Sequence, residues 1–252
     1  MARTDTLGNF LTDVATAIRE KKGTTDTILA SNFDTEIASI QGGSSKYAPR
    51  FIRFYNYKGT ELNEEIANLD TSNITDMSYM FYTNNMLQSL DLSNFDVSNV
   101  TNMGGMFQNC YKLSNLYLGT FDTSKVTSMN RMFEGCKLLV TIKKLDAIKS
   151  IGVNGIFDDC LSLKDFGGLE NLGKAYETSK PANNNNYKLD LSTCTSLTEQ
   201  SLINVLTNLY DIAAKGCNTQ QVVLGATNLA KLTSEEGQSA LASATEKGWS
   251  IS

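Results

Sequence analysis

A repeat of about 26 residues in the middle of the chain is the feature that most restricts its fold. Methionines and phenylalanines recur at this constant interval: Met77, Met103 and Met129; Met80, Met106 and Met132; Phe81, Phe107 and Phe133. A fourth unit continues the pattern at a shorter interval, with Phe157 placed two positions earlier than the constant interval would put it. Because one such unit cannot bury its apolar face alone, the repeat predicts a stack of units that share one continuous core.

Each repeat combines two periodicities. Leu90-Asp91-Leu92 and Leu116-Tyr117-Leu118 alternate apolar and polar residues, which predicts a short strand with one buried face. From Val100 to Phe107, apolar residues recur every three or four positions, which predicts a short helical turn. We therefore predict an α/β fold: a solenoid of repeats in which short strands form a ladder on one side and helical turns lie on the other.

The repeated segment LDLSNFDVSNVTNMGGMFQNC, residues 90–110, resembles the BspA-like leucine-rich repeat family, whose Met-rich, Phe-containing units have this length. The resemblance extends over residues 62–169 and implies a leucine-rich-repeat solenoid of the kind found in surface and virion proteins. The fourth unit departs from the pattern, because Val153 and Ile156 replace methionines and the unit is shorter. The repeated residues are packing residues, so the resemblance is specific for fold and not for ligand.

Residues 1–43 are predicted to form a separate helical module for attachment or oligomerisation. Its apolar attachment face consists of Leu7, Phe10, Leu11, Val14 and Ile18. A module of this size seldom holds a core alone, so we expect it to pack on other virion proteins or on copies of itself, as in a homotrimer. Residues 7–40 also resemble a segment of tail-associated proteins in phages of Gram-positive gut bacteria.

The repeats are assigned to residues 46–175, and a polar loop with a C-terminal α/β cap to residues 176–252. A strand over residues 51–57 is predicted to cover the first repeat. The predicted elements of the cap are a helix after the N-cap Thr198, a strand over residues 221–224, a helix from a capping box of Thr233 and Glu236 to Gly248, and a strand from Trp249 to Ile251. This ending is similar to units that follow BspA-like repeats in phage proteins.

The composition argues against several functions. The chain has no histidine, which removes His-dependent triads and His metal sites. Its formal charge is -5, so we expect no nucleic-acid partner. No segment approaches the run of about 18 apolar residues that crosses a bilayer, and no signal peptide is visible. We therefore expect neither export by a signal peptide nor membrane insertion.

Three repeated residue types could in principle bind metals, and each has a simpler interpretation. Columns of methionine, and of Cys110, Cys136 and Cys160, are interpreted as core. The aspartates Asp70, Asp96 and Asp122 could form a calcium ladder or cap turns, and we favour turn capping.

Two pairs of adjacent carboxylates could suggest acid-base catalysis on glycosides: Asp158-Asp159 and Glu64-Glu65. Adjacent residues do not converge on one bond of a substrate, so both pairs are interpreted as parts of solvated loops. We predict no cofactor, no metal and no catalytic residue.

The best candidates for binding lie on the strand face and in a polar loop. Asp91, Tyr117 and Lys143 occupy equivalent positions of successive repeats and should line up. Tyrosine among polar residues is a common anchor for glycans and proteins, although an ordinary solvated sheet face explains the same residues. The candidate loop residues are Asn183, Asn184, Asn185, Asn186 and Tyr187.

These observations favour a non-enzymatic binding protein on a phage virion, such as a tail, baseplate or fibre component. In this hypothesis the solenoid recognises a glycan or protein of the bacterial surface. The alternatives are a bacterial cell-surface adhesin, for which we would expect an export signal and wall anchor, and a purely structural virion protein. An enzyme acting on surface polymers would require convergent carboxylates or an activated nucleophile.

Overall fold

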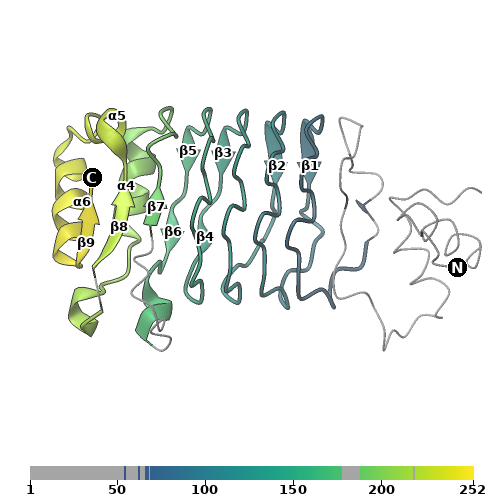
Figure 1. The fold of residues 1–252 in the computed structure, drawn as a ribbon, viewed down its shortest axis with the longest axis horizontal. Coiled ribbons are helices and arrows are strands. Elements are labelled where there is room, and N and C mark those ends of the chain that lie inside the picture. Colours follow the sequence, from purple (N-terminus) through teal and green to yellow (C-terminus); the bar gives the residue numbers. More distant parts are fainter. Residues whose placement is uncertain (1–53, 55–61, 63–65, 68, 178–187, 218) are drawn as a thin grey trace, which may run out of the picture.

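The computed structural model describes residues 54, 62, 66–67, 69–177, 188–217 and 219–252. Within them, short parallel strands alternate with turns and a few helices, which confirms the predicted α/β content. Repeat units lie side by side along the long axis, and a sheet with two larger helices follows at one end (Figure 1). The units begin at Asp76, Asn102, Ser128 and Gly152, which pair with one another as parallel bridges. We number the units 1 to 4, over residues 76–101, 102–127, 128–151 and 152–177.

A column of stacked phenylalanine rings runs through the units. Phe81, Phe107, Phe133 and Phe157 occupy the same position in units 1 to 4, and all four are fully buried. Successive ring centroids are 5.3 to 5.6 Å apart, and successive rings are nearly parallel. Phe54 extends the column, with its ring centroid 5.7 Å from that of Phe81. Because stacked aromatic pairs contribute beyond the area they bury, this column stabilises every contact between neighbouring units.

The Met- and Phe-containing segment of each unit forms tight turns, so the predicted helical turn is wrong. In unit 2 the N–H groups of Met103, Gly105 and Phe107 donate to carbonyl oxygens of unit 3 at 2.8 to 2.9 Å. The intervening N–H group of Met106 closes a turn on Met103, and that of Cys110 closes one on Phe107. Gly105 has a φ of +62°, which an α-helix does not contain. Because alternate N–H groups join neighbouring units, the segment cannot make the continuous bonds of a helix.

The strands of the repeat units pair in parallel but form separate two-stranded sheets. The pairs are β1 (Ser89–Asp91) with β2 (Asn115–Tyr117), β3 (Thr141–Ile142) with β5 (Asp165–Phe166), and β4 (Leu145–Asp146) with β6 (Leu169–Glu170). Within the described units β2 and β3 are not paired, so the predicted continuous ladder is interrupted between units 2 and 3.

The C-terminal segment has its own sheet. A 3-10 helix, η2 (Lys174–Glu177), follows unit 4, and β7 (Lys188–Asp190), β8 (Gln220–Val223) and β9 (Trp249–Ile251) then form a parallel sheet in that order. The helices α4 (Glu199–Thr207) and α6 (Glu235–Glu246) pack against each other. The remaining elements are η3 (Ala213–Lys215) and α5 (Gly225–Leu229). The predicted strands near residues 221–224 and 249–251 and both predicted helices are confirmed.

The ends of these helices test the predicted caps. The side chain of Thr198 accepts the N–H of Ser201, as predicted for the N-cap of α4. The N-cap of α6 is Ser234, whose hydroxyl accepts the N–H of Gly237 at 3.0 Å. The predicted capping box of Thr233 and Glu236 is therefore wrong by one residue, because the hydroxyl that meets a free N–H of the first turn belongs to Ser234.

A column of four buried cysteines, one more than predicted, accompanies the phenylalanines. The thiols of Cys110, Cys136, Cys160 and Cys194 each donate to a phenylalanine carbonyl oxygen of the preceding unit, at 3.1 to 3.3 Å. Cys194 belongs to the segment assigned to the cap, so the packing pattern of the repeats continues beyond residue 188. The domain limits stay predictions, and the module of residues 1–43 lies outside the described residues.

Replacing Phe107 with alanine should lower the free energy of unfolding by about 3 to 5 kcal/mol, because the change removes a fully buried ring between two others. Urea unfolding followed by circular dichroism measures this loss. Tyr111→Ala is the matched control: this ring is 41% exposed, and its loss should cost less than about 1 kcal/mol. A similarly small loss for Phe107→Ala would contradict the stacked core.

We expect all five cysteines to be thiols in the folded protein. Burial raises the pKa of Cys110 and of Cys194 to about 12 and also raises the pKa of Cys136 and Cys160. Because the thiolate is the reactive form, these four should resist DTNB in the native state while the half-buried Cys217 reacts. In denaturant without reductant the reagent should detect five thiols, and a Cys110–Cys136 disulfide in intact-mass or peptide analysis would contradict the prediction.

Candidate functional site

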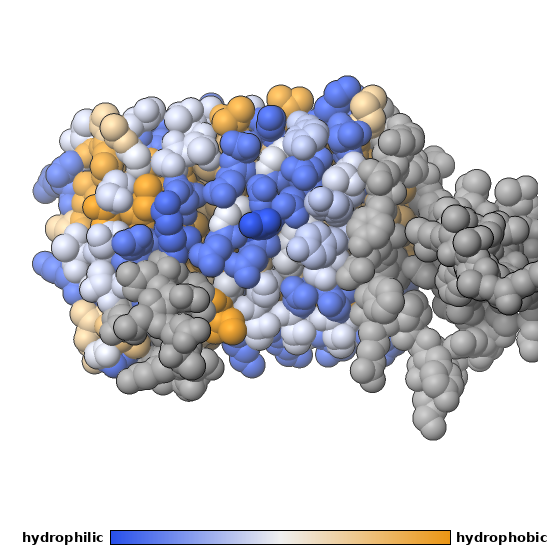
Figure 2. Space-filling view, in the orientation of Figure 1, coloured by the Kyte–Doolittle hydropathy of each residue, from blue (hydrophilic) through white to orange (hydrophobic). Residues whose placement is uncertain are grey.

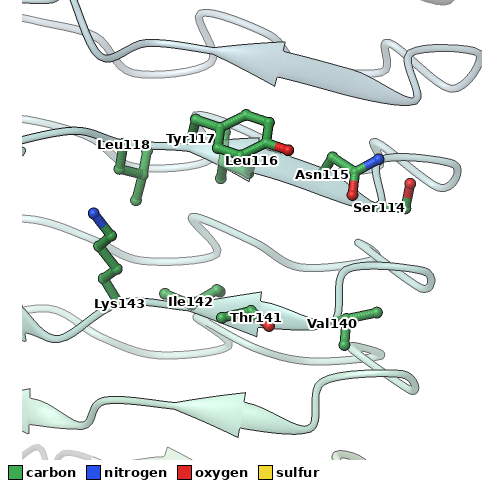
Figure 3. Close-up of a pocket in the computed structure, with 9 residues that line it drawn as sticks. All are labelled: Ser114, Asn115, Leu116, Tyr117, Leu118, Val140, Thr141, Ile142 and Lys143. Atoms are coloured by element: carbon green, nitrogen blue, oxygen red, sulfur yellow. The ribbon is translucent and has the colours of Figure 1, made fainter.

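A groove of about 520 Å³ lies on the strand side of the stack, between β2 of unit 2 and β3 of unit 3 (Figure 3). One wall consists of residues 114–118 and the other of residues 140–143. The groove coincides with the interruption of strand pairing, because no main-chain hydrogen bond of the described units joins these two walls. On the sides away from the groove, β2 pairs with β1 and β3 pairs with β5.

The groove lies where two shapes of repeat unit meet. In units 1 and 2 the strand is followed by a turn, closed by hydrogen bonds from Phe95 N–H to Leu92 O and from Phe121 N–H to Leu118 O, both 3.0 Å long. Units 3 and 4 lack this turn, and β3 and β5 continue through two residues into β4 and β6. Units of the same shape pair with each other, whereas the change of shape separates β2 from β3.

The missing turn also accounts for the shorter repeat interval. The bridge residues Asn102 and Ser128 lie two positions further apart along the chain than the bridge residues Ser128 and Gly152. The shortening therefore lies within unit 3, between β3 and β4, and not in the fourth unit as predicted. The interval from Phe133 to Phe157 contains the end of unit 3 and only the start of unit 4. A short interval before Phe157 therefore indicates a short unit 3.

Units 2 and 3 remain joined behind the groove. The N–H groups of Met103 and Phe107 donate to unit 3 at 2.9 and 2.8 Å, and Ile151 N–H donates to Thr127 O at 2.9 Å. The centroids of the Phe107 and Phe133 rings are 5.3 Å apart, the shortest distance in the column of stacked parallel rings. The separation is therefore confined to the strand side, since the turn segments and phenylalanine rings of the two units stay in contact.

Main-chain groups of both walls face the gap. In the β1–β2 pair, Asn115 N–H donates to Gln88 O and Leu92 N–H donates to Tyr117 O, so these two residues of β2 direct their main chains to β1. Since N–H and C=O groups alternate between the two sides of a parallel strand, those of Leu116 face β3. By the same reasoning, the bond from Gly167 N–H to Ile142 O directs Ile142 to β5 and leaves the main chain of Thr141 facing β2.

The structure brings together two of the three strand-face residues predicted to bind. Tyr117 and Lys143 lie on opposite walls of the groove, and the Tyr117 side chain is 58% exposed. In Figure 3 the Lys143 side chain extends from β3 towards β2, and its Nζ lies 3.4 Å from Gly119 O. Asp91 on β1 is in register with Tyr117 but does not line the groove, because β1 lies on the other side of β2. Its carboxylate accepts the N–H of Ser93 at 2.9 Å.

Sequence reasoning missed the groove residues Leu116, Val140 and Thr141. Leu116 was assigned to the buried face, yet it is only partly buried, and Val140 is 40% exposed. The available signal was the shortening of the repeat interval by two positions. The predicted loop residues Asn183 to Asn186 and Tyr187, and the predicted attachment face of Leu7, Phe10, Leu11, Val14 and Ile18, lie outside the described residues.

The repeated aspartates close turns, as the favoured interpretation predicts. The carboxylates of Asp70, Asp96 and Asp122 each accept the main-chain N–H of the serine two residues further along, at 2.9 to 3.0 Å. Asp91 and Asp190 make the same bond to Ser93 and Ser192. Across residues 69–177 and the described C-terminal part, no group of three or more Cys, Asp and Glu side chains converges as a metal site would.

One of the acidic pairs differs from its predicted environment. Asp159 is exposed, but Asp158 is half-buried, and burial raises the pKa of its carboxyl. The nearby carboxylates of Asp190 and Glu134 add to this increase. Asp190 itself pairs with Lys188 Nζ at 2.6 Å. Asp158 is therefore less solvated than predicted, and the charges of Asp190 and Lys188 act on its carboxyl.

The turn aspartates should make the fold sensitive to acid. Hydrogen bonds from the serine hydroxyl, and then from the serine N–H, lower the pKa of Asp70, Asp91 and Asp96 below the ordinary value of about 3.9. Their contribution to stability is complete above that value and is lost as the pH falls through the lower folded-state pKa.

This expectation can be tested with the triple variant Asp70→Asn, Asp91→Asn, Asp96→Asn, whose amides keep an acceptor but do not titrate. Melting temperatures measured between about pH 5 and pH 2 should fall less steeply for the variant than for the unmodified protein. Equal slopes would show that these three carboxylates are not linked to folding.

One family model matches part of the chain. No curated protein and no solved structure matches the chain. No helix among the described residues has the length and apolar character needed to span a membrane. Residues 52–167 match the family model described as "Mycoplasma protein of unknown function, DUF285", and this match, which contains units 1 to 3 and the groove, is consistent with a BspA-like repeat protein.

Proposed function

We propose that this chain is a non-enzymatic binding protein in which a BspA-like leucine-rich-repeat solenoid recognises a component of the bacterial surface. The observation that carries the proposal is the groove between β2 and β3, with Tyr117 and Lys143 on its two walls. Stacked units hold these walls in place through the buried phenylalanine column, so little order has to be gained when a ligand binds.

The surface chemistry of the groove suits recognition. Tyrosine offers a large contact area and one hydroxyl at a small cost in side-chain freedom, and lysine adds a mobile cationic donor. The face of the repeat units seen in Figure 2 is largely hydrophilic, whereas hydrophobic residues gather at its upper rim and over the C-terminal segment. The groove itself adds the apolar side chains of Leu116, Val140 and Ile142, so a ligand with both polar and apolar groups fits it.

Several features support binding over catalysis. The chain has no histidine, and the turn aspartates are engaged by serine N–H groups and hydroxyls. The buried thiols have raised pKa values, which disfavours them as nucleophiles. The groove walls, residues 114–118 and 140–143, carry no carboxylate that could act as a general acid or base.

The finer part of the proposal is that the protein belongs to a phage virion. In this arrangement residues 1–43 attach it to another virion protein or to further copies of itself, and the repeats face the host. The resemblance of residues 7–40 to tail-associated proteins supports this arrangement. Mass spectrometry of purified particles from a phage that carries the gene should detect the chain. Its absence from particles, together with its recovery from the bacterial envelope, would favour a cell-surface adhesin.

The binding role is tested with the double variant Tyr117→Ala, Lys143→Ala in the full chain. Binding of the fluorescently labelled protein to host cells, measured by flow cytometry, should weaken by about tenfold or more, with a nearly unchanged melting temperature because the changes leave the core intact. The matched control is Tyr111→Ala, Lys137→Ala: Lys137 Nζ lies 5.4 Å from the Tyr111 ring centroid on the same two units, and neither residue lines the groove. Equal loss in both variants, or none in either, would contradict a role for the groove.

A further inference from the structure

We propose that the groove binds the acetamido group of an N-acetylated sugar, which names the ligand class of the binding function proposed above and rests on it. An acetamido group carries one N–H donor, one carbonyl acceptor and a methyl group on a planar unit. The gap between β2 and β3 offers an N–H donor for the carbonyl oxygen and an apolar surface for the methyl group.

The apolar partner is Leu116, which the separation of the strands uncovers. Equivalent positions in the four units hold Leu90, Leu116, Ile142 and Phe166. Leu90, Ile142 and Phe166 are at most 2% exposed, whereas Leu116 is only partly buried. A partly exposed leucine at the base of a polar face is a surface on which a methyl group gains by leaving water.

The polar partners are main-chain N–H and C=O groups of the kind that join β1 to β2 and β3 to β5. Leu116 on one wall and Thr141 on the other each direct an N–H and a C=O into the gap, because their neighbours Asn115 and Ile142 are bonded away from it. The carbonyl oxygen of an amide at the gap can accept from one of these N–H groups while its methyl group lies on Leu116. The groove thus places an N–H donor beside an apolar surface, which matches the carbonyl and methyl groups of an acetamido substituent.

The width of the gap decides between an amide substituent and an inserted peptide strand. A strand that paired with both walls would need them about 9.5 Å apart, twice the ordinary spacing of strands. Residues of β2 and β3 have Cα atoms within 8 Å of each other. The phenylalanine column and the bonds to unit 3 behind the groove oppose further opening. The gap is therefore too narrow for a complete strand and is suited to a single planar group.

Three residues at the edge of the groove can contact a sugar ring: Asn115, Tyr117 and Lys143. The exposed Tyr117 ring lies next to Leu116 on β2, where a pyranose attached to the bound amide can stack its C–H face on the aromatic ring (Figure 3). Asn115 and Lys143 line the same groove with exposed polar groups that can bond sugar hydroxyls. The Lys143 Nζ lies 3.4 Å from its carbonyl partner Gly119, a long hydrogen bond that a hydroxyl can replace.

The test is a titration of the full chain with N,N′,N″-triacetylchitotriose, followed by isothermal calorimetry and by chemical-shift changes of the amides of residues 114–118 and 140–143. Cellotriose, which has a hydroxyl where the probe has an acetamido group, should bind at least about tenfold more weakly. Tyr117→Ala should weaken binding of the acetylated probe by about tenfold, whereas Tyr111→Ala should leave it unchanged.

A second variant addresses the main-chain partner directly. Thr141→Pro removes the N–H that faces the gap, and this N–H takes no part in the β3–β5 pair. It should weaken binding of the acetylated probe by about tenfold or more, whereas Thr141→Val, which keeps the N–H, should lose less. If Thr141→Pro does not fold, the comparison of the two sugars and the Tyr117→Ala variant still decides.

Equal affinity for the two trisaccharides, or shift changes confined to residues outside the groove, would overturn the inference. Binding of an extended peptide at the groove, with no binding of the acetylated sugar, would also overturn it and would indicate a protein ligand. The binding function itself is judged separately. If Tyr117→Ala, Lys143→Ala abolishes cell binding and the acetylated probe neither binds nor competes, the ligand class is wrong and the function stands.

Discussion

Main-chain hydrogen bonds between neighbouring units set the spacing on which the rest of this structure depends. Alternate N–H groups of each turn segment reach the next unit, which fixes the separation of equivalent residues at about the 4.8 Å of paired strands. At that separation identical side chains meet, and aromatic rings stack with centroids 5.3 to 5.7 Å apart. The column of buried cysteines follows from the same geometry, since each thiol donates to a phenylalanine carbonyl oxygen of the preceding unit.

Much of this arrangement could be predicted from spacing in the sequence. The intervals of Met103, Phe107 and Cys110 with their equivalents identify the residues that face the core, because only stacked units place such residues together. The N-cap of α4 at Thr198 and the turn role of Asp96 follow from local hydrogen-bonding preferences that tertiary structure does not override here.

The parts that were not predicted depend on contacts between units, which local periodicity does not report. Apolar residues three and four positions apart occur both in helices and in successive turns with bonds to residue i−3, so the segment from Val100 to Phe107 allowed either structure. The groove was missed for a related reason. The shorter interval before Phe157 is visible in the sequence. Its structural consequence lies on the strand side, at Leu116 and Thr141, which are distant from Phe157 in the sequence.

The change of unit shape that opens the groove has a consequence for how such proteins can vary. The groove proposed to bind a ligand arises at one boundary between longer and shorter units, and it does not require a dedicated loop or an inserted domain. A deletion of two residues in unit 2, between its strand and the following turn, would move the boundary, and with it the opening, by one unit along the stack while the phenylalanine column stayed intact. Diversification of ligands within an array of this kind could therefore proceed through changes of repeat length, with the exposed side chains at each boundary supplying a different rim.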